Sequence, residues 1–272
     1  MAEKVYRINE STLTEIGDTL RSITGKSDKI EVTNIKTEIA EIGQAEDALI
    51  SRVMSSNYFN NRVTAIGSGA FYFCDNLTTV SFPAATVINN YAFANCSNLT
   101  TISFPVATAI GSSAFYYCKS LTSLNFPAVT TIDNFAFYSC DNLTIASFPV
   151  AITIGSNAFY LCKNLTSLNF PAVTTINSGA FYNCKSLISI NFPAATIIGS
   201  GAFRYCSSLT IVSFPVAATV NSDAFYGCNN LTAIDFPVAT AIGSNAFYGC
   251  SSLTTVSLPA ALNIGPSAFV GC

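Results

Sequence analysis

Histidine and tryptophan are absent from this 272-residue chain, and charged residues make up only 10% of it. Without histidine the chain lacks the usual general base and the commonest metal ligand near neutral pH. The net charge is −3 and there is no basic cluster, which argues against electrostatic binding of nucleic acid. Half of the residues are apolar, which is ample for a buried core.

Long hydrophobic runs are also lacking. No stretch approaches the roughly 18–20 apolar residues that a membrane-spanning helix requires. The opening MAEKVYRINES lacks the apolar core of a secretion signal, and no sorting or lipid-anchor signal follows Cys272. We therefore expect no membrane insertion. The chain is expected to be cytoplasmic as synthesised, and to reach a virion or a cell surface only by another route.

Charge is concentrated at the amino-terminal end. Residues 1–52 hold seven Lys/Arg and ten Asp/Glu, whereas residues 63–272 hold only four Lys/Arg and five Asp/Glu. This change in composition predicts a domain border near residues 50–60. We assign residues 1–50 to a leader and residues 51–272 to a second domain, within which 51–62 form an amino-terminal cap.

Ten cysteines recur at a strict 22-residue interval, with no insertion or deletion between them. They are Cys74, Cys96, Cys118, Cys140, Cys162, Cys184, Cys206, Cys228, Cys250 and Cys272. A fixed period of this length is typical of a solenoid, in which each repeat forms one coil and each slot of the repeat returns to the same place. We predict ten 22-residue coils.

Counted from each cysteine, the repeat reads C-x-x-L-T-x-Φ-x-F-P-x-x-x-x-I-x-x-x-A-F-x-x, where Φ is usually aliphatic. The alternation before the proline predicts a strand with one buried face, and the proline ends it. Parallel strands and right-handed connections are expected. Only Gly, Asn or Asp follows the isoleucine, which predicts a left-handed corner. A Ser or Asn usually comes next and predicts a cap for one helical turn that holds Ala-Phe and the cysteine.

The segments L-T-x-Φ-x-F-P, Ile-Gly and A-F-x-x-C resemble the BspA-like leucine-rich repeat family over about residues 60–272. The resemblance implies an α/β repeat solenoid, a right-handed superhelix with a parallel β-sheet on its concave face. It also implies bacterial surface adhesion or protein binding. The chain departs from the family in lacking an export signal. It also has Phe where Leu or Ile is more usual, which implies a bulkier core.

The leader is predicted to form a short helical hairpin. Its apolar side chains recur at helical spacing in two stripes, formed by Leu13, Ile16, Leu20 and Ile23, and by Ile35, Ile39 and Ile42. The pattern resembles a small helical module at the start of tail-associated proteins of phages and prophages. The simpler interpretation is that residues 1–50 only cap the solenoid.

An even cysteine count permits disulfides, but identical slots in successive coils point their Cβ atoms in parallel rather than toward each other. We therefore predict free, buried thiols, with disulfides or a metal as the lesser alternatives. The carboxylates of the repeats are scattered singly and the serines have no histidine partner. The sequence predicts no catalytic, cofactor or metal site, and no enzyme activity.

Two columns of outward side chains on the predicted strand form the candidate binding face. The first is Ser81, Ser103, Asn125, Ser147, Asn169, Asn191, Ser213, Asp235 and Ser257. The second is Thr79, Thr101, Ser123, Ile145, Ser167, Ser189, Ile211, Ala233 and Thr255. Both are small and almost uncharged, so a merely solvated sheet face is the alternative.

A tyrosine column just after Ala-Phe is a second candidate surface, an aromatic strip for glycan or protein contact. Its members are Tyr116, Tyr138, Tyr160, Tyr182, Tyr226 and Tyr248, and Tyr72 shares the slot. The simpler interpretation is that each ring covers the edge of its own coil.

Two functions of different classes follow from these patterns. The first is a non-enzymatic binding module that meets a protein or glycan through the concave sheet. The second is a structural assembly component, such as a virion or tail-associated subunit docked through the leader, or a homo-oligomer formed through the ends. The scarcity of charge on the repeats leaves little to oppose association and motivates this second function.

Overall fold

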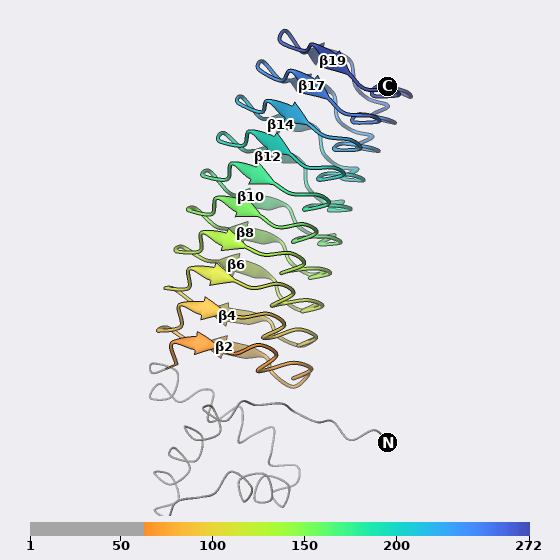
Figure 1. Ribbon diagram of the computed structural model, residues 1–272. Coiled ribbons are helices and arrows are strands. Elements are labelled where there is room, and N and C mark those ends of the chain that lie inside the picture. Colours follow the sequence, from red (N-terminus) through yellow and green to blue (C-terminus); the bar gives the residue numbers. More distant parts are fainter. Residues whose placement is uncertain (1–62) are drawn as a thin grey trace, which may run out of the picture.

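The computed structural model describes residues 63–272, which form one elongated stack of coils (Figure 1). Each 22-residue repeat makes one coil, and each coil carries two short strands on opposite sides of the interior. There are nine three-residue strands, so the described part is a parallel-strand solenoid of about nine turns rather than ten. The leader, the predicted helical hairpin and the 51–62 cap lie outside the described residues.

Two sets of strands alternate along the chain. The three-residue set, before the proline, is β2 (Thr79–Ser81), β4 (Thr101–Ser103), β6 (Ser123–Asn125), β8 (Ile145–Ser147), β10 (Ser167–Asn169), β12 (Ser189–Asn191), β14 (Ile211–Ser213), β16 (Ala233–Asp235) and β18 (Thr255–Ser257). The two-residue set is β1 (Ala65–Ile66), β3 (Val87–Ile88), β5 (Ala109–Ile110), β7 (Thr131–Ile132), β9 (Thr153–Ile154), β11 (Thr175–Ile176), β13 (Ile197–Ile198), β15 (Thr219–Val220), β17 (Ala241–Ile242) and β19 (Asn263–Ile264).

All pairing between these strands is parallel, as the sequence predicts, and each residue pairs with its equivalent one repeat away. The two-residue strands form a single ten-stranded sheet along the whole stack. The three-residue strands instead form four separate sheets, namely β2–β4, β6–β8–β10, β12–β14 and β16–β18. The sheet expected on this side is therefore present but interrupted in three places.

The interruptions coincide with wider spacing in the core beneath them. Where the three-residue strands pair, the rings of successive strand phenylalanines lie 5.2–5.7 Å apart. At the three interruptions the separations are 6.2, 6.0 and 5.9 Å, for Phe104–Phe126, Phe170–Phe192 and Phe214–Phe236. In paired coils the phenylalanine N–H also donates to the next strand, as Phe148 does to the Asn169 carbonyl at 2.9 Å.

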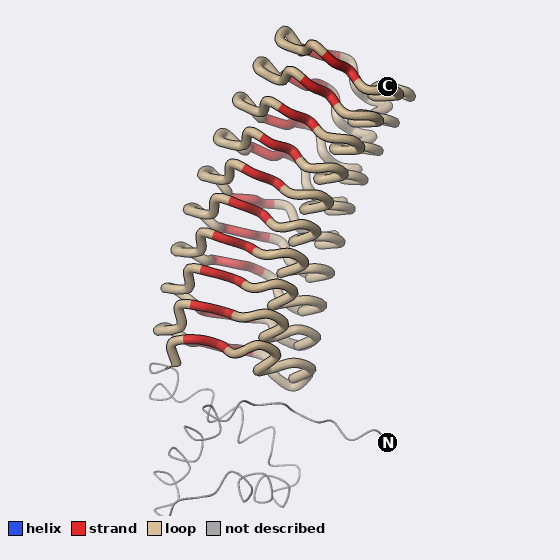
Figure 2. The backbone as a smooth tube through the Cα atoms, viewed as in Figure 1, coloured by secondary structure: helices blue, strands red, loops and turns tan. Residues whose placement is uncertain are grey.

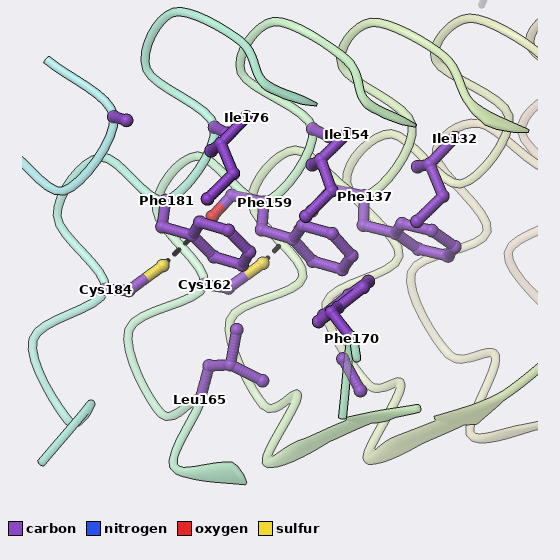
Figure 3. Close-up of a cluster of buried hydrophobic side chains, with 14 of the residues drawn as sticks. Ile132, Phe137, Ile154, Phe159, Cys162, Leu165, Phe170, Ile176, Phe181 and Cys184 are labelled. Atoms are coloured by element: carbon purple, nitrogen blue, oxygen red, sulfur yellow. Dashed lines mark hydrogen bonds between the residues drawn. The ribbon is translucent and has the colours of Figure 1, made fainter. Parts of the chain in front are cut away.

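The interior is built from the slots that the repeat predicts, namely the Leu, the Φ residue, both phenylalanines, the Ile and the cysteine. Phe159 shows the packing: its ring lies 5.2 Å from both Phe137 and Phe181 and is nearly parallel to each. Phe170 meets it edge-on at 5.8 Å. Figure 3 shows these rings side by side with Ile154, Ile176 and Leu165 around them. Each coil thus gains its core contacts largely from its neighbours, as a solenoid requires.

The helical turn predicted around Ala-Phe is not formed, and no helix occurs within residues 63–272 (Figure 2). The segment is a tight turn in which alternate N–H groups donate to the next coil instead of back along a helix. Phe135 donates to the Ser156 carbonyl at 2.9 Å, and Phe137 to that of Ala158 at 2.8 Å. The N–H groups in between donate three residues back within the coil, as Tyr138 does to Phe135.

The left-handed positions also differ from the prediction. They lie five residues and one residue before each cysteine, and include bulky residues such as Tyr91, Phe135 and Leu161. A left-handed backbone costs such residues about 1–2 kcal/mol, which the inter-coil hydrogen bonds of the turn offset. The slot after the isoleucine is not left-handed. Its glycines are required for close approach: a Cβ on Gly155 would lie 2.5 Å from the backbone carbon of Asp133.

None of the ten cysteines forms a disulfide, as predicted, and eight of their thiols are buried. The exceptions are the two outermost: Cys74 is half-buried and Cys272 is exposed, so for these two the prediction of burial is wrong. Each thiol from Cys96 onward donates to the carbonyl of the Phe 25 residues earlier, as Cys162 Sγ does to Phe137 at 3.2 Å (Figure 3). Burial raises the pKa of these thiols, to about 12 for Cys206, so they remain protonated donors.

Candidate binding surfaces

The two outward columns of the three-residue strands lie on one side of the stack, and we call them together the strand face. Every residue of the column from Thr79 to Thr255 is exposed. In the column from Ser81 to Ser257, six residues are exposed and Ser81, Ser147 and Ser257 are half-buried. The structure therefore brings all the residues of the predicted binding face together on one surface.

The positions of these side chains are fixed by the coils beneath them. Within β6–β8–β10, Ser167 pairs with Ile145 and Asn169 pairs with Ser147. Asn169 Nδ2 also donates to Ser147 Oγ at 3.0 Å, which ties two coils together on the outside. Beside the columns, a ladder of threonine hydroxyls donates to carbonyls of the preceding coil, as Thr166 Oγ1 does to Thr144 at 3.1 Å. The strand face is thus an ordered surface of small side chains.

Isoleucines break this polar pattern at three points. Ile145 and Ile211 interrupt the column from Thr79 to Thr255, and both are exposed. Ile188, which the predicted face omits, replaces a threonine of the hydroxyl ladder and is 58% exposed. The signal that identifies Ile188 is already in the sequence: it is the one residue in the slot after the repeat leucine that is not threonine.

The predicted aromatic strip is a stack of rings rather than a set of separate edges. The rings of Tyr116, Tyr138, Tyr160 and Tyr182 stack with nearly parallel planes. The distances between the centres of successive rings are 4.8, 4.8 and 4.4 Å. Tyr226 and Tyr248 form a second stack at 4.8 Å. Partial burial raises the pKa of Tyr116, Tyr138 and Tyr182. The inner rings cover each other's faces, so the strip offers mainly hydroxyl-bearing edges to a ligand.

Arg204 separates the two tyrosine stacks because it takes the tyrosine slot in its coil. Its guanidinium lies 4.1 Å from the centre of the Tyr226 ring and 3.1 Å from an Asp223 carboxylate oxygen. It also donates to the Tyr205 hydroxyl at 3.3 Å. Tyr72 lies apart from both stacks, since Ala94 occupies the slot between it and Tyr116.

No group of three or more His, Cys, Asp or Glu side chains within residues 63–272 is arranged to hold a metal ion. The ion pairs Lys163–Asp141, at 3.8 Å, and Arg204–Asp223 involve no residue of the strand face, and Arg204 lies against the Tyr226 ring. In the same range, no helix has the length and apolar character that crossing a bilayer requires.

These stacked 22-residue coils define a leucine-rich-repeat solenoid. The chain belongs to the family described as the BspA type leucine rich repeat region, whose model matches residues 7–86, 86–210 and 174–272. The matched ranges span the whole repeat domain and confirm the family that the sequence motifs indicate. Proteins of this family and fold are typically non-enzymatic binding scaffolds.

This chain is similar to several solved structures. A leucine rich cell surface protein from Faecalibacterium prausnitzii is 25% identical, with a TM-score of 0.56, over 77% of this chain and 69% of that one. A leucine-rich repeat protein from Bacteroides ovatus is 24% identical, with a TM-score of 0.43, over 77% and 80% of the two chains. The Treponema pallidum leucine rich repeat protein is 27% identical, with a TM-score of 0.48, over 65% and 82%.

A comparison with curated proteins finds no match. The family model that reaches into the leader, from residue 7, is the leucine-rich-repeat model. The predicted likeness of the leader to a tail-associated module therefore gains no support, and the leader itself lies outside the described residues.

Proposed function

We propose that this protein is a non-enzymatic binding module that engages a protein or glycan partner through its strand face. The observation that carries the proposal is the ordering of exposed side chains into two columns, each fixed by strand register and by a rigid core. Such a surface is preorganised, so little conformational entropy is lost when a partner binds. The likeness to a leucine rich cell surface protein supports a role in adhesion or protein binding.

The surface chemistry favours recognition by hydrogen bonds and shape. Of the eighteen residues in the two columns, Asp235 alone is charged, and most of the others are Ser, Thr or Asn. Groups of this kind donate and accept hydrogen bonds without the desolvation cost of a full charge. The concave placement that the family implies for this sheet would add contact on both sides of a bound partner.

Selection against two panels tests the proposal: a yeast-displayed library of random peptides and a glycan array. We expect ligands selected on the native protein to lose at least about tenfold in affinity when Asn169 and Asn191 are both changed to Arg. The matched control carries the same charges on the other sheet, as Thr131→Arg in β7 with Ile197→Arg in β13, both at exposed positions, and should bind normally. Retained binding by the Asn169→Arg, Asn191→Arg variant, or equal loss in the control, would refute the assignment to the strand face.

A further inference from the structure

Two exposed isoleucines lie in adjacent coils, Ile211 on the strand face and Ile188 in the hydroxyl ladder beside it, and we call the two together the isoleucine patch. They are 58% and 62% exposed, the highest values for any isoleucine in residues 63–272. In the slot of Ile188 every other repeat has threonine. In the slot of Ile211 the other repeats have Thr or Ser, apart from Ile145 and Ala233. The patch is thus a local departure from a polar pattern.

Strand pairing brings the backbones of the two residues close together. Strands β12 and β14 form one of the hydrogen-bonded pairs of this side, with Ser189 in register with Ile211. The Ile211 N–H lies 3.4 Å from the Ile188 carbonyl oxygen, to which it donates. In the next coil, Ala233 takes the same slot as Ile211 and is also exposed. Exposed apolar residues therefore occur in three successive coils, the third of them across the interruption between β14 and β16.

Polar groups surround the patch, and one of them is charged. Ser189, Asn191 and Ser213 lie along its edge, all exposed. Asp235 lies one coil on and two residues along from Ile211, across the interruption between β14 and β16. Paired-strand spacing would make this separation roughly 8 Å, so it is about that or slightly more. Asp235 is the single charged residue of the two outward columns and is exposed. A partner group that faces this part of the surface meets a negative charge beside an apolar anchor point.

We infer that the isoleucine patch is the anchor for a protein partner. The partner segment places a large apolar side chain on Ile188 and Ile211 and a Lys or Arg side chain beside Asp235. This inference rests on the proposed function and names the class of ligand within it. An apolar centre with a polar rim is the arrangement of a protein–protein hot spot. Sugar rings are recognised by hydrogen bonds and aromatic faces, and an exposed isoleucine pair supplies neither.

The repeat provides conservative substitutions and a matched control. Ile188→Thr and Ile211→Thr install residues that the other coils carry in these slots. The new hydroxyl at position 188 can donate to the Thr166 carbonyl, as Thr210 Oγ1 does to the Ile188 carbonyl at 3.0 Å. Ile145→Thr makes the same change in the same slot as Ile211, but at an isolated isoleucine whose neighbours in the column are Ser123 and Ser167.

The experiment uses the peptides selected on the native full-length chain from the yeast-displayed library. We expect them to share a large apolar residue next to Lys or Arg. Their affinity should fall about tenfold or more for the Ile188→Thr, Ile211→Thr variant and by less than about twofold for Ile145→Thr. Asp235→Asn should weaken binding about threefold at low salt and have less effect at high salt, because the charge pair is exposed. Thermal unfolding of each variant checks that the fold is intact.

The outcomes separate this inference from the proposed function. Peptides that lose affinity for the Asn169→Arg, Asn191→Arg variant but bind the Ile188→Thr, Ile211→Thr variant normally would overturn the inference alone. Equal loss with Ile145→Thr would overturn it too, as would selected ligands that are all glycans. If no ligand is enriched above an unrelated control protein, or none is sensitive to any change on the strand face, the proposed function fails and the inference fails with it.

Discussion

Two parts of each coil, the Ala-Phe turn and the strand face, differ in how regularly they repeat along the stack. From Phe93 to Phe269, rings of the turn phenylalanines repeat at 5.2–5.3 Å without exception. The strand phenylalanines vary from 5.2 to 6.2 Å, and the sheet above them is interrupted three times. This difference in spacing indicates that the two parts have different roles. The turn sets the stacking of the coils, and the strand face is free to vary in sequence.

The thiols lie beside the regularly repeating turn, and unfolding at alkaline pH should reveal their contribution to stability. Burial raises the pKa of a thiol above its ordinary value of about 9, to about 12 for Cys206. A group with a raised folded-state pKa stabilises the fold fully below the unfolded pKa, and that stability is lost as pH rises through the folded value. Each buried thiol should lower the free energy of unfolding by about 1.4 kcal/mol per pH unit above 9.

The total free energy of unfolding is only about 5–15 kcal/mol. Because eight thiols are buried, we expect the protein to unfold steeply between about pH 9.5 and 11. Circular dichroism measures this transition. A Cys162→Ser, Cys184→Ser variant isolates the thiols, since its hydroxyls keep the donors but do not ionise. Its transition should be shallower and shifted to higher pH. An unchanged transition, or a native protein still folded at pH 12, would contradict the role of the thiols.

The next largest difference between the core at the Ala-Phe turn and the strand face should appear when one side chain of each is truncated and the free energy of unfolding is compared. Phe159→Ala removes a fully buried ring stacked between two others and should lower the free energy of unfolding by about 3–5 kcal/mol. Asn169→Ala, on the strand face, should change it by less than about 0.5 kcal/mol. Urea unfolding measures both. Similar values for the two variants would mean that the strand face also sets the stacking of the coils.

The tyrosine strip should show the smallest effect and sharpen the comparison. Tyr160→Phe keeps the ring between Tyr138 and Tyr182 and should leave unfolding unchanged within about 0.3 kcal/mol. Tyr160→Ala removes the stacking and should cost about 1 kcal/mol. A larger loss for the phenylalanine variant than for the alanine variant would show that the hydroxyl, rather than the ring, stabilises the turn. Thermal unfolding of the two variants beside the native chain measures this difference.

The repeat slots could be predicted from the sequence because they depend on a strict period. Phe159, Ile154, Leu165 and Cys162 all return every 22 residues and are all buried, as the period predicts. The turn could not be predicted in the same way. A Ser or Asn before Ala-Phe indicates a helix cap locally, but the N–H of Phe137 donates to the next coil. Local propensity does not report such a long-range bond.

The candidate site was predictable to a similar degree. Register places Asn169 beside Ser147 because both hold the same slot, so the strand face follows from the period alone. The interruptions between its sheets do not, since they depend on small differences in spacing between coils. Bulky left-handed residues such as Phe135 are also invisible to a pattern based on Gly, Asn and Asp.

The measurement that tests the account most directly is the reactivity of the thiols in the folded protein. Central to the account is a continuous apolar interior that includes the sulfurs of eight coils. A thiol reagent at neutral pH should label Cys272 promptly and Cys74 more slowly, and should reach the other eight only after denaturation. Rapid labelling of Cys140, Cys162 or Cys184 in the native state would contradict the account.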